Sequence, residues 1–200
     1  MIELGAVAAP LGASRELEPL RSPSPLSVGV VVWLASELMF FAGLFAAYFT
    51  LRAGTTPWPP DGVELATART ALATAVLVSS SFTMHGAVAA GARNDRRQAL
   101  RWLGLTVVLG LVFLGNQAWE YAEAPFSISS HAYGTAFYLM TGFHGLHVIG
   151  GLLFMGAVAG VIGGSGSRAP AGETLEVCGY YWHFVDVVWV AMFATLYLLQ

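Results

Sequence analysis

Six carboxyl and imidazole side chains lie well inside long apolar stretches of this 200-residue sequence. They are Glu37, His85, His144, His147, His183 and Asp186. Ionisable groups are costly in an apolar setting, where they mark either a function or a buried partner. Carboxyl and imidazole groups can hold protons, and they can also join two helices through hydrogen bonds. These six residues are therefore the first candidates for a functional site.

The depth of these residues can be estimated by assuming that each apolar stretch is a helix. At about 1.5 Å per residue, Glu37, His147 and Asp186 fall near the middle of their stretches, and His85 and His183 lie about one turn below. We therefore expect a polar cluster in the interior of a bundle. Glu37 would be desolvated there, which favours a protonated carboxyl that donates a hydrogen bond. A structural acid and a proton-handling group both stay open for Glu37.

The two closely spaced pairs have competing interpretations. His144 and His147 are three residues apart and share one helix face, so they could ligate a metal or a haem. A metal site normally needs three or four ligands, so we favour a hydrogen-bonded core pair and expect no metal in this chain. His183 and Asp186 have the same spacing, which favours a local pair that stabilises one helix.

Three further residues lie near the ends of the apolar stretches: Glu120, Tyr121 and His131. We expect them at a membrane interface, where Glu120 can stay ionised. The sequence shows no nucleophile with an adjacent base, no phosphate loop and no dinucleotide fingerprint. We therefore expect no catalytic centre in this chain.

The composition indicates which elements must position these residues. Apolar residues make up 56% of the chain and charged residues 10%, whereas a soluble domain carries roughly a quarter charged residues. A net charge of -3 without a basic patch argues against nucleic-acid binding. Five stretches reach the roughly 20 residues that a membrane-spanning helix needs. They cover about 27–51, 70–92, 100–121, 133–162 and 177–200.

The continuous apolar character of these stretches predicts an all-α, polytopic membrane protein, a bundle of five transmembrane helices over residues 27–200. Gly156, Gly160 and Gly164 recur every four residues, which predicts a close helix approach. Arginines gather on one side of the predicted membrane, at Arg15, Arg21, Arg93, Arg96, Arg97, Arg101 and Arg168. This asymmetry predicts a cytoplasmic N-terminal segment, residues 1–26, and an outside C-terminus.

Four motifs in order resemble subunit III of the haem–copper cytochrome c oxidases. They are the segments 36–48 (SELMFFAGLFAAY), 119–126 (WEYAEAPF, followed by Tyr133-Gly134), 141–150 (TGFHGLHVIG) and 181–189 (YWHFVDVVW). Together with their spacing they cover nearly everything from Val28 to the C-terminus. The resemblance identifies the chain as a short, five-helix member of this family.

The resemblance implies an accessory, non-redox subunit of a bacterial plasma-membrane oxidase that passes electrons from cytochrome c to oxygen. Such a subunit packs on subunit I, together with subunit II, and haem a and copper belong to those partners. It supports proton uptake, protects subunit I from inactivation during turnover and holds structural phospholipid. Glu37 matches the buried, carbodiimide-reactive carboxyl of the family. A cytochrome bc complex, in a larger respiratory assembly, is a further partner that the resemblance leaves open.

This sequence departs from longer family members, and rival functions stay open. Longer members have seven helices, and the two that are absent here form one arm of a lipid-filled cleft. The equivalent subunit of a quinol oxidase or a nitric oxide reductase is an alternative, because the electron donor binds elsewhere. An independent proton-conducting transport protein is an alternative of another class, although the sequence lacks the repeats and broken helices typical of transporters.

Overall fold

The computed structural model describes residues 25–164 and 171–199 of the chain, and all regular elements in this part are helices. Its elements are α1 (Pro25–Gly54), α2 (Thr67–Ala92), α3 (Arg96–Glu123), α4 (Ala132–Gly163), α5 (Ala171–Phe193) and the short π-helix η1 (Ala194–Leu198). The described ranges hold five helices long and apolar enough to cross a membrane, with α5 and η1 counted together. This confirms the all-α, five-span prediction. The predicted N-terminal segment lies almost wholly outside the described residues.

The helix boundaries differ from the sequence estimate mainly at the fifth span. α5 begins at Ala171, before the expected start at 177, so Glu173 and Glu176 belong to its first turns. The turn between α2 and α3 is tight: Asn94 adopts a left-handed conformation with φ 57°, and Asp95 caps α3 by accepting a hydrogen bond from the Gln98 amide at 3.0 Å.

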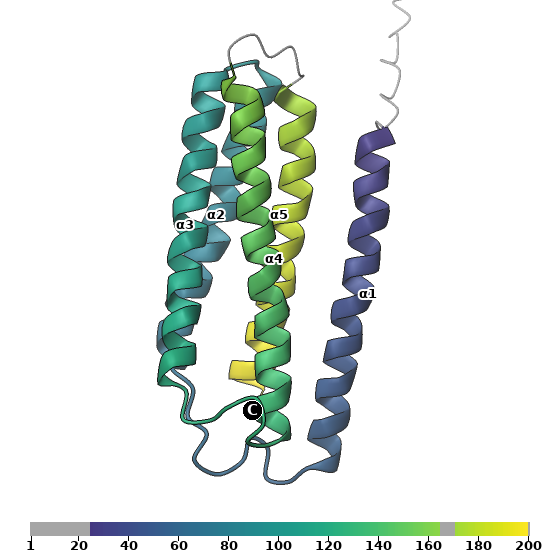
Figure 1. Ribbon diagram of the computed structural model, residues 1–200, viewed down its shortest axis with the longest axis vertical. Helices are drawn as coiled ribbons and strands as arrows, with labels where there is room; N and C mark the ends of the chain where they lie inside the picture. The colour runs from purple at the N-terminus through teal and green to yellow at the C-terminus, as the bar shows by residue number, and fades with distance from the viewer. Residues whose placement is uncertain (1–24, 165–170, 200) are drawn as a thin grey trace, which may run out of the picture.

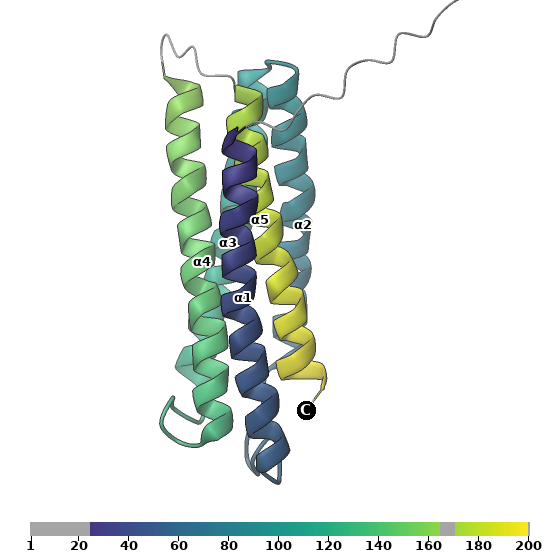
Figure 2. The same cartoon turned by 90° about the vertical axis from the view of Figure 1, so that its right-hand side faces the viewer.

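Four helices form a closed bundle and the first lies outside it. α2, α3, α4 and α5 pack in a ring, while α1 lies against α4 and α5 (Figures 1 and 2). Only Phe41 and Tyr48 of α1 are buried. Stacking of Trp33 on Tyr181, with ring centroids 5.4 Å apart, and a hydrogen bond from the Tyr48 hydroxyl to the Thr195 carbonyl fix α1 to α5 and η1.

The side chain of Trp182 in α5 lies inside the ring of helices. Trp182 is fully buried and donates a 2.8 Å hydrogen bond from Nε1 to Ser80 Oγ of α2. Gly110 of α3 and Gly151 of α4 make room for it, because a Cβ at either position would lie 2.9 Å from the indole ring. Close helix approach therefore occurs at these two glycines.

The glycine stripe expected from the sequence does not form a close contact. A Cβ added at Gly156 or Gly160 would meet nothing within 4 Å among the described residues, and one at Gly164 would meet only backbone of its own helix end. The four-residue spacing is right for a packing stripe, but α4 turns this face away from its neighbours.

The two ends of the bundle differ in their charges. The end that holds the start of α1 also holds the α2–α3 turn, with Arg93, Arg96 and Arg97 (Figure 1). The other end holds Arg52 and Arg69. Arg15, Arg21 and Arg168, on which the predicted orientation also relied, lie outside the described residues, so the orientation stays a prediction.

Candidate functional site

Glu37 of α1 faces His147 of α4 across the seam between the outer helix and the ring. Glu37 Oε2 lies 3.2 Å from His147 Nε2, and the side chains are 24% and 17% exposed. His147 Nδ1 lies 2.7 Å from the carbonyl oxygen of Phe143, one turn earlier in α4. Two of the residues expected at the same depth therefore meet, and their contact lies on the side of the bundle rather than in its interior.

Aromatic side chains hold this pair in place. The Phe41 ring meets the His147 imidazole edge-on, with centroids 5.0 Å apart. The Tyr181 hydroxyl donates a 2.8 Å hydrogen bond to the main-chain carbonyl of His147. α1, α4 and α5 thus all contribute to the setting of one carboxyl–imidazole contact.

His144 turns away from His147 and into the ring. It is 1% exposed and lies between Phe113 and Trp189, at centroid distances of 5.9 and 4.9 Å. Neither of its ring nitrogens has a hydrogen-bond partner in the described part of the chain. The two histidines therefore lie in different environments. They do not form the hydrogen-bonded core pair that the spacing suggested.

A second polar group joins α2 and α5. Ser81 donates a hydrogen bond to Asp186 Oδ2, and Ser81 Oγ lies 2.9 Å from His183 Nδ1. A serine hydroxyl has one proton to give, so His183 Nδ1–H donates to Ser81, which in turn donates to Asp186. The bridge between His183 and Asp186 thus comes from another helix, whereas the sequence suggested a local pair. Ser81 belongs to the polar run Ser79–Ser81, a signal that the sequence analysis passed over.

His85 lies on the exposed surface of α2, one turn after Ser81. The six candidates therefore do not converge into one interior cluster. Glu37 meets His147, Asp186 meets His183 through Ser81, His144 is buried apart from both groups, and His85 faces outward. Residue spacing fixes height along a helix, but the direction in which each side chain points follows from packing.

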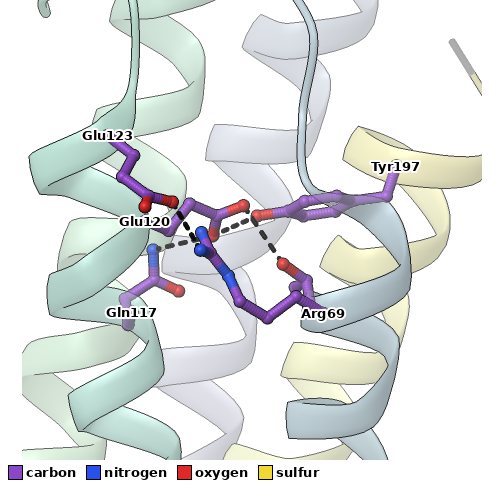
Figure 3. A network of polar contacts seen from close by, with 6 residues as sticks. Arg69, Gln117, Glu120, Glu123 and Tyr197 are labelled. Atoms are coloured by element: carbon purple, nitrogen blue, oxygen red, sulfur yellow. Dashed lines mark hydrogen bonds and ion pairs between the residues drawn. The ribbon is translucent and has the colours of Figure 1, made fainter.

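Glu120 is the centre of a buried network at the end of the bundle that holds η1 (Figure 3). It lies in the last turn of α3 and is 3% exposed, so at this height its carboxyl faces the inside of the protein. Tyr197 donates to Oε2 at 2.7 Å, and Thr70 donates to Oε1 at 3.1 Å. The Gln117 amide adds a longer bond of 3.5 Å. Three elements, α2, α3 and η1, are thus joined through one carboxyl group.

Arg69 borders this network on the outside. Its guanidinium donates to Glu123 Oε2 at 2.5 Å (Figure 3). It also lies 4.9 Å from the centre of the Trp119 ring. Thr70, Tyr197 and Arg69 were not singled out from the sequence. They lie far from Glu120 along the chain, and only the packing of α2 antiparallel to both α3 and α5 brings them together.

Tyr121 and His131 make local structural contacts. The Tyr121 hydroxyl lies 2.7 Å from Thr141 Oγ1, which joins α3 to α4. His131 caps α4, and its Nδ1 accepts a hydrogen bond from the Gly134 amide at 2.8 Å. Among the described residues no three His, Cys, Asp or Glu side chains come together in a way that could hold a metal ion.

Comparisons with known proteins agree with this architecture. The family described as "Cytochrome c oxidase subunit III" matches residues 19–200. A "Probable cytochrome c oxidase subunit 3" of Nocardia farcinica is 46% identical over 193 residues, covering 94% of each chain. The protein of the same name in Mycobacterium tuberculosis strain H37Rv is 47% identical, covering 90% of this chain and 91% of its own.

A more distant relative preserves the same length. The "Cytochrome c oxidase subunit 3" of Corynebacterium diphtheriae is 40% identical over 196 residues, which cover 95% of this chain and 96% of that one. Relatives of nearly equal length thus match over at least nine tenths of both chains. The chain belongs to the cytochrome c oxidase subunit III family.

Proposed function

We propose that this chain supports proton uptake by subunit I of an oxidase that passes electrons from cytochrome c to oxygen, and that it protects subunit I from inactivation during turnover. Family membership supports the role of an accessory oxidase subunit. The names of the relatives favour a cytochrome c oxidase over a quinol oxidase or a nitric oxide reductase. In the structure, the proton-related part of the proposal is carried by the Glu37–His147 pair.

The geometry of this pair implies a shared proton. If His147 Nδ1–H donates to the Phe143 carbonyl, Nε2 is either a bare acceptor or carries the second proton of an imidazolium. A carboxylate facing a bare nitrogen would place two acceptors against each other. One proton therefore belongs between Glu37 and His147, whether on oxygen or on nitrogen. A carboxyl–imidazole contact of this kind can hold a proton deep in an apolar layer without a net charge.

The proposal includes the placement of the chain. Its N-terminus would lie in the cytoplasm and its C-terminus outside the plasma membrane of a bacterium, since Arg93, Arg96 and Arg97 gather at one end. Subunits I and II would be its protein partners, and phospholipid would cover its remaining apolar surface. Haem a and copper, which supply the redox chemistry of such an oxidase, would be held by those partners.

The test compares three forms of the purified oxidase: with the native chain, with the Glu37→Gln variant, and depleted of the chain. Oxygen consumption is measured as a function of pH, and the number of turnovers before inactivation is recorded. We expect depletion to slow turnover most at high pH, where protons are scarce, and to shorten the active lifetime. We expect Glu37→Gln to reproduce the loss at high pH but not the shorter lifetime.

Two results would contradict the proposal. An unchanged pH profile after depletion would remove the role in proton uptake. A native pH profile with Glu37→Gln would assign any proton role to another group of the chain. His85→Gln serves as the matched control, because it replaces an exposed histidine of a span that lies away from the pair.

A further inference from the structure

Asp186 is a buried carboxyl group near the middle of the last membrane span. Ser81 donates a hydrogen bond to its Oδ2, whereas Oδ1 has no partner in the described part of the chain. The residue is 5% exposed and lies 15 residues after Ala171, which is about 22 Å along the helix. A carboxylate that is buried with a single donor is costly. An ionisable group at this depth therefore calls for a functional explanation.

Ser81 connects this carboxyl to an imidazole that reaches the protein surface. Its Oγ lies 2.9 Å from His183 Nδ1. His183 is partly exposed and borders a groove of about 260 Å³ along the α2–α5 seam. Its other nitrogen, Nε2, makes no hydrogen bond among the described residues and is not enclosed by them. His183 Nε2 can therefore receive a proton from the groove, whereas Asp186 is reached through Ser81.

The relay of His183, Ser81 and Asp186 can take up one proton while each heavy atom keeps its partner. With the carboxylate ionised, His183 Nδ1–H donates to Ser81, and the Ser81 hydroxyl donates to Asp186 Oδ2. A proton that binds His183 Nε2 makes an imidazolium. The Nδ1 proton then passes to Ser81 Oγ, and the serine proton passes to Oδ2. Both hydrogen bonds now run the other way, from a neutral acid through Ser81 to a neutral imidazole that carries its proton on Nε2.

The unpartnered oxygen of Asp186 fits the neutral acid better than the carboxylate. Hydrogen bonds to ionised groups are roughly twice as strong as those between neutral groups. Leaving Oδ1 without a donor therefore costs less once the carboxyl holds a proton. Because the described part of the chain places no group at Oδ1, no further step leads away from that oxygen. The geometry thus favours a group that holds a proton over one that conducts it across the membrane.

The titratable groups on the other helices of the bundle are engaged elsewhere, with one exception. Glu37 of α1 and His147 of α4 pair with each other. His144 of α4 lies between two aromatic rings. Glu120 of α3 has its own donors at the end of the bundle that holds η1. The exception is His85 of α2, which is exposed and interacts electrostatically with the imidazole of the relay.

We propose that this relay is a second proton-binding site of the chain, in which His183 takes up a proton from the groove and Asp186 stores one. The site goes beyond the proposed function, whose proton-related part is carried by the Glu37–His147 pair. It lies on another seam of the bundle, between α2 and α5, and shares no residue with that pair. Its ligand is the proton alone, and its capacity is one proton per chain.

The first experiment records the infrared spectrum of the full chain in lipid nanodiscs, with isotope-labelled aspartate. The chain has three aspartates, and the other two, Asp61 and Asp95, are exposed between helices. We expect the carbonyl band of a neutral aspartic acid without a hydrogen bond to its C=O at neutral pH. Raising the pH should remove this band, because the acid then loses its proton. Absence of the band at neutral pH would overturn the proposal.

The variant Asp186→Asn assigns the band. We expect the band to be lost in this variant, and its persistence would overturn the proposal. If the variant fails to fold, the assignment comes from the labelled native chain, in which Asp186 is the buried aspartate.

The second experiment follows the His183 tautomer by nitrogen NMR of the histidine-labelled chain in the same nanodiscs. The variant His183→Gln identifies its resonances. We expect the proton on Nε2 while Asp186 is neutral, and on Nδ1 after Asp186 ionises. A purely structural hydrogen bond would not make this switch. A tautomer that stays unchanged while the aspartic acid band disappears would overturn the relay.

The variant Ser81→Ala tests the serine that connects the two groups. Without its hydroxyl, the tautomer of His183 should no longer follow the protonation of Asp186. Ser79→Ala is the matched control, because the Ser79 hydroxyl belongs to the same polar run but donates to the Ala75 carbonyl of its own helix. The tautomer switch should stay native in this control. A switch that persists in Ser81→Ala would overturn the role of the serine.

Failure of this inference can be told apart from failure of the proposed function. The spectra are recorded on the chain itself and need no oxidase turnover. An unchanged pH profile of the oxidase after depletion of the chain would remove the proposed function and leave this proton site standing. Absence of the aspartic acid band would remove the site and leave the proposal for Glu37 and His147 in place.

Discussion

Two carboxyl groups of this membrane protein are arranged in opposite ways. Glu120 is buried at one end of the bundle and accepts hydrogen bonds from three side chains on α2, α3 and η1. Glu37 lies near the middle of α1, is about a quarter exposed and meets a single partner, His147. The first is satisfied within its own chain, whereas the second lies on a side that faces lipid or a neighbouring subunit.

This difference separates an acid that joins several helices of the chain from an acid that makes one contact. A carboxyl whose oxygens are all engaged internally joins helices, and its removal leaves several donors unsatisfied. A carboxyl that meets a single imidazole leaves only that one group without its partner when it is replaced. Both residues occur in family-like motifs, so the motifs alone do not distinguish them.

The largest expected effect follows from the replacement Glu120→Ala. Tyr197, Thr70 and Gln117 would lose their shared acceptor inside the protein, and we expect unfolding free energy to fall by about 2–3 kcal/mol. A denaturation series in detergent micelles measures this value. Glu123→Gln is the control, since it changes an exposed carboxylate one turn along and should have a smaller effect. A neutral result for Glu120→Ala would show that the network does not stabilise the bundle.

A smaller effect is expected from Tyr197→Phe. This change removes one hydroxyl and one 2.7 Å hydrogen bond to Glu120, while Thr70 and Gln117 continue to donate. We expect a loss of about 1 kcal/mol, measured in the same denaturation series. In the double variant with Glu120→Ala the two losses should not add, because both act on one contact. Additive losses would mean that the hydroxyl has another role.

The smallest structural effect is expected from Glu37→Gln. A glutamine amide can still donate to a bare His147 Nε2, so the loss should stay below about 0.6 kcal/mol, the average for a membrane hydrogen bond. The variant should also stay with the oxidase during purification. Loss of the chain from the complex, or a destabilisation as large as that of Glu120→Ala, would make Glu37 a structural acid and end the contrast with Glu120.

Much of the fold could be predicted from the sequence, because five apolar stretches of sufficient length leave few alternatives in a bilayer. The polar contacts were harder to predict. The Glu37–His147 contact agrees with their shared depth, but the burial of Glu120 does not follow from its place near a helix end. Its donors Thr70 and Tyr197 are far away in sequence, and ordinary threonine and tyrosine positions near span ends give no signal of their role.

The sequence by itself determined which segments cross the membrane, how deep each ionisable residue lies and to which family the chain is similar. Residue count sets height because a helix rises by a fixed amount per residue. The tertiary structure decided which side chains at equal height meet. Close packing at Gly110 and Gly151 around Trp182 fixes the rotation of the ring helices. In the packed ring His144 points inward, His85 points outward, and Asp186 of α5 meets Ser81 of α2.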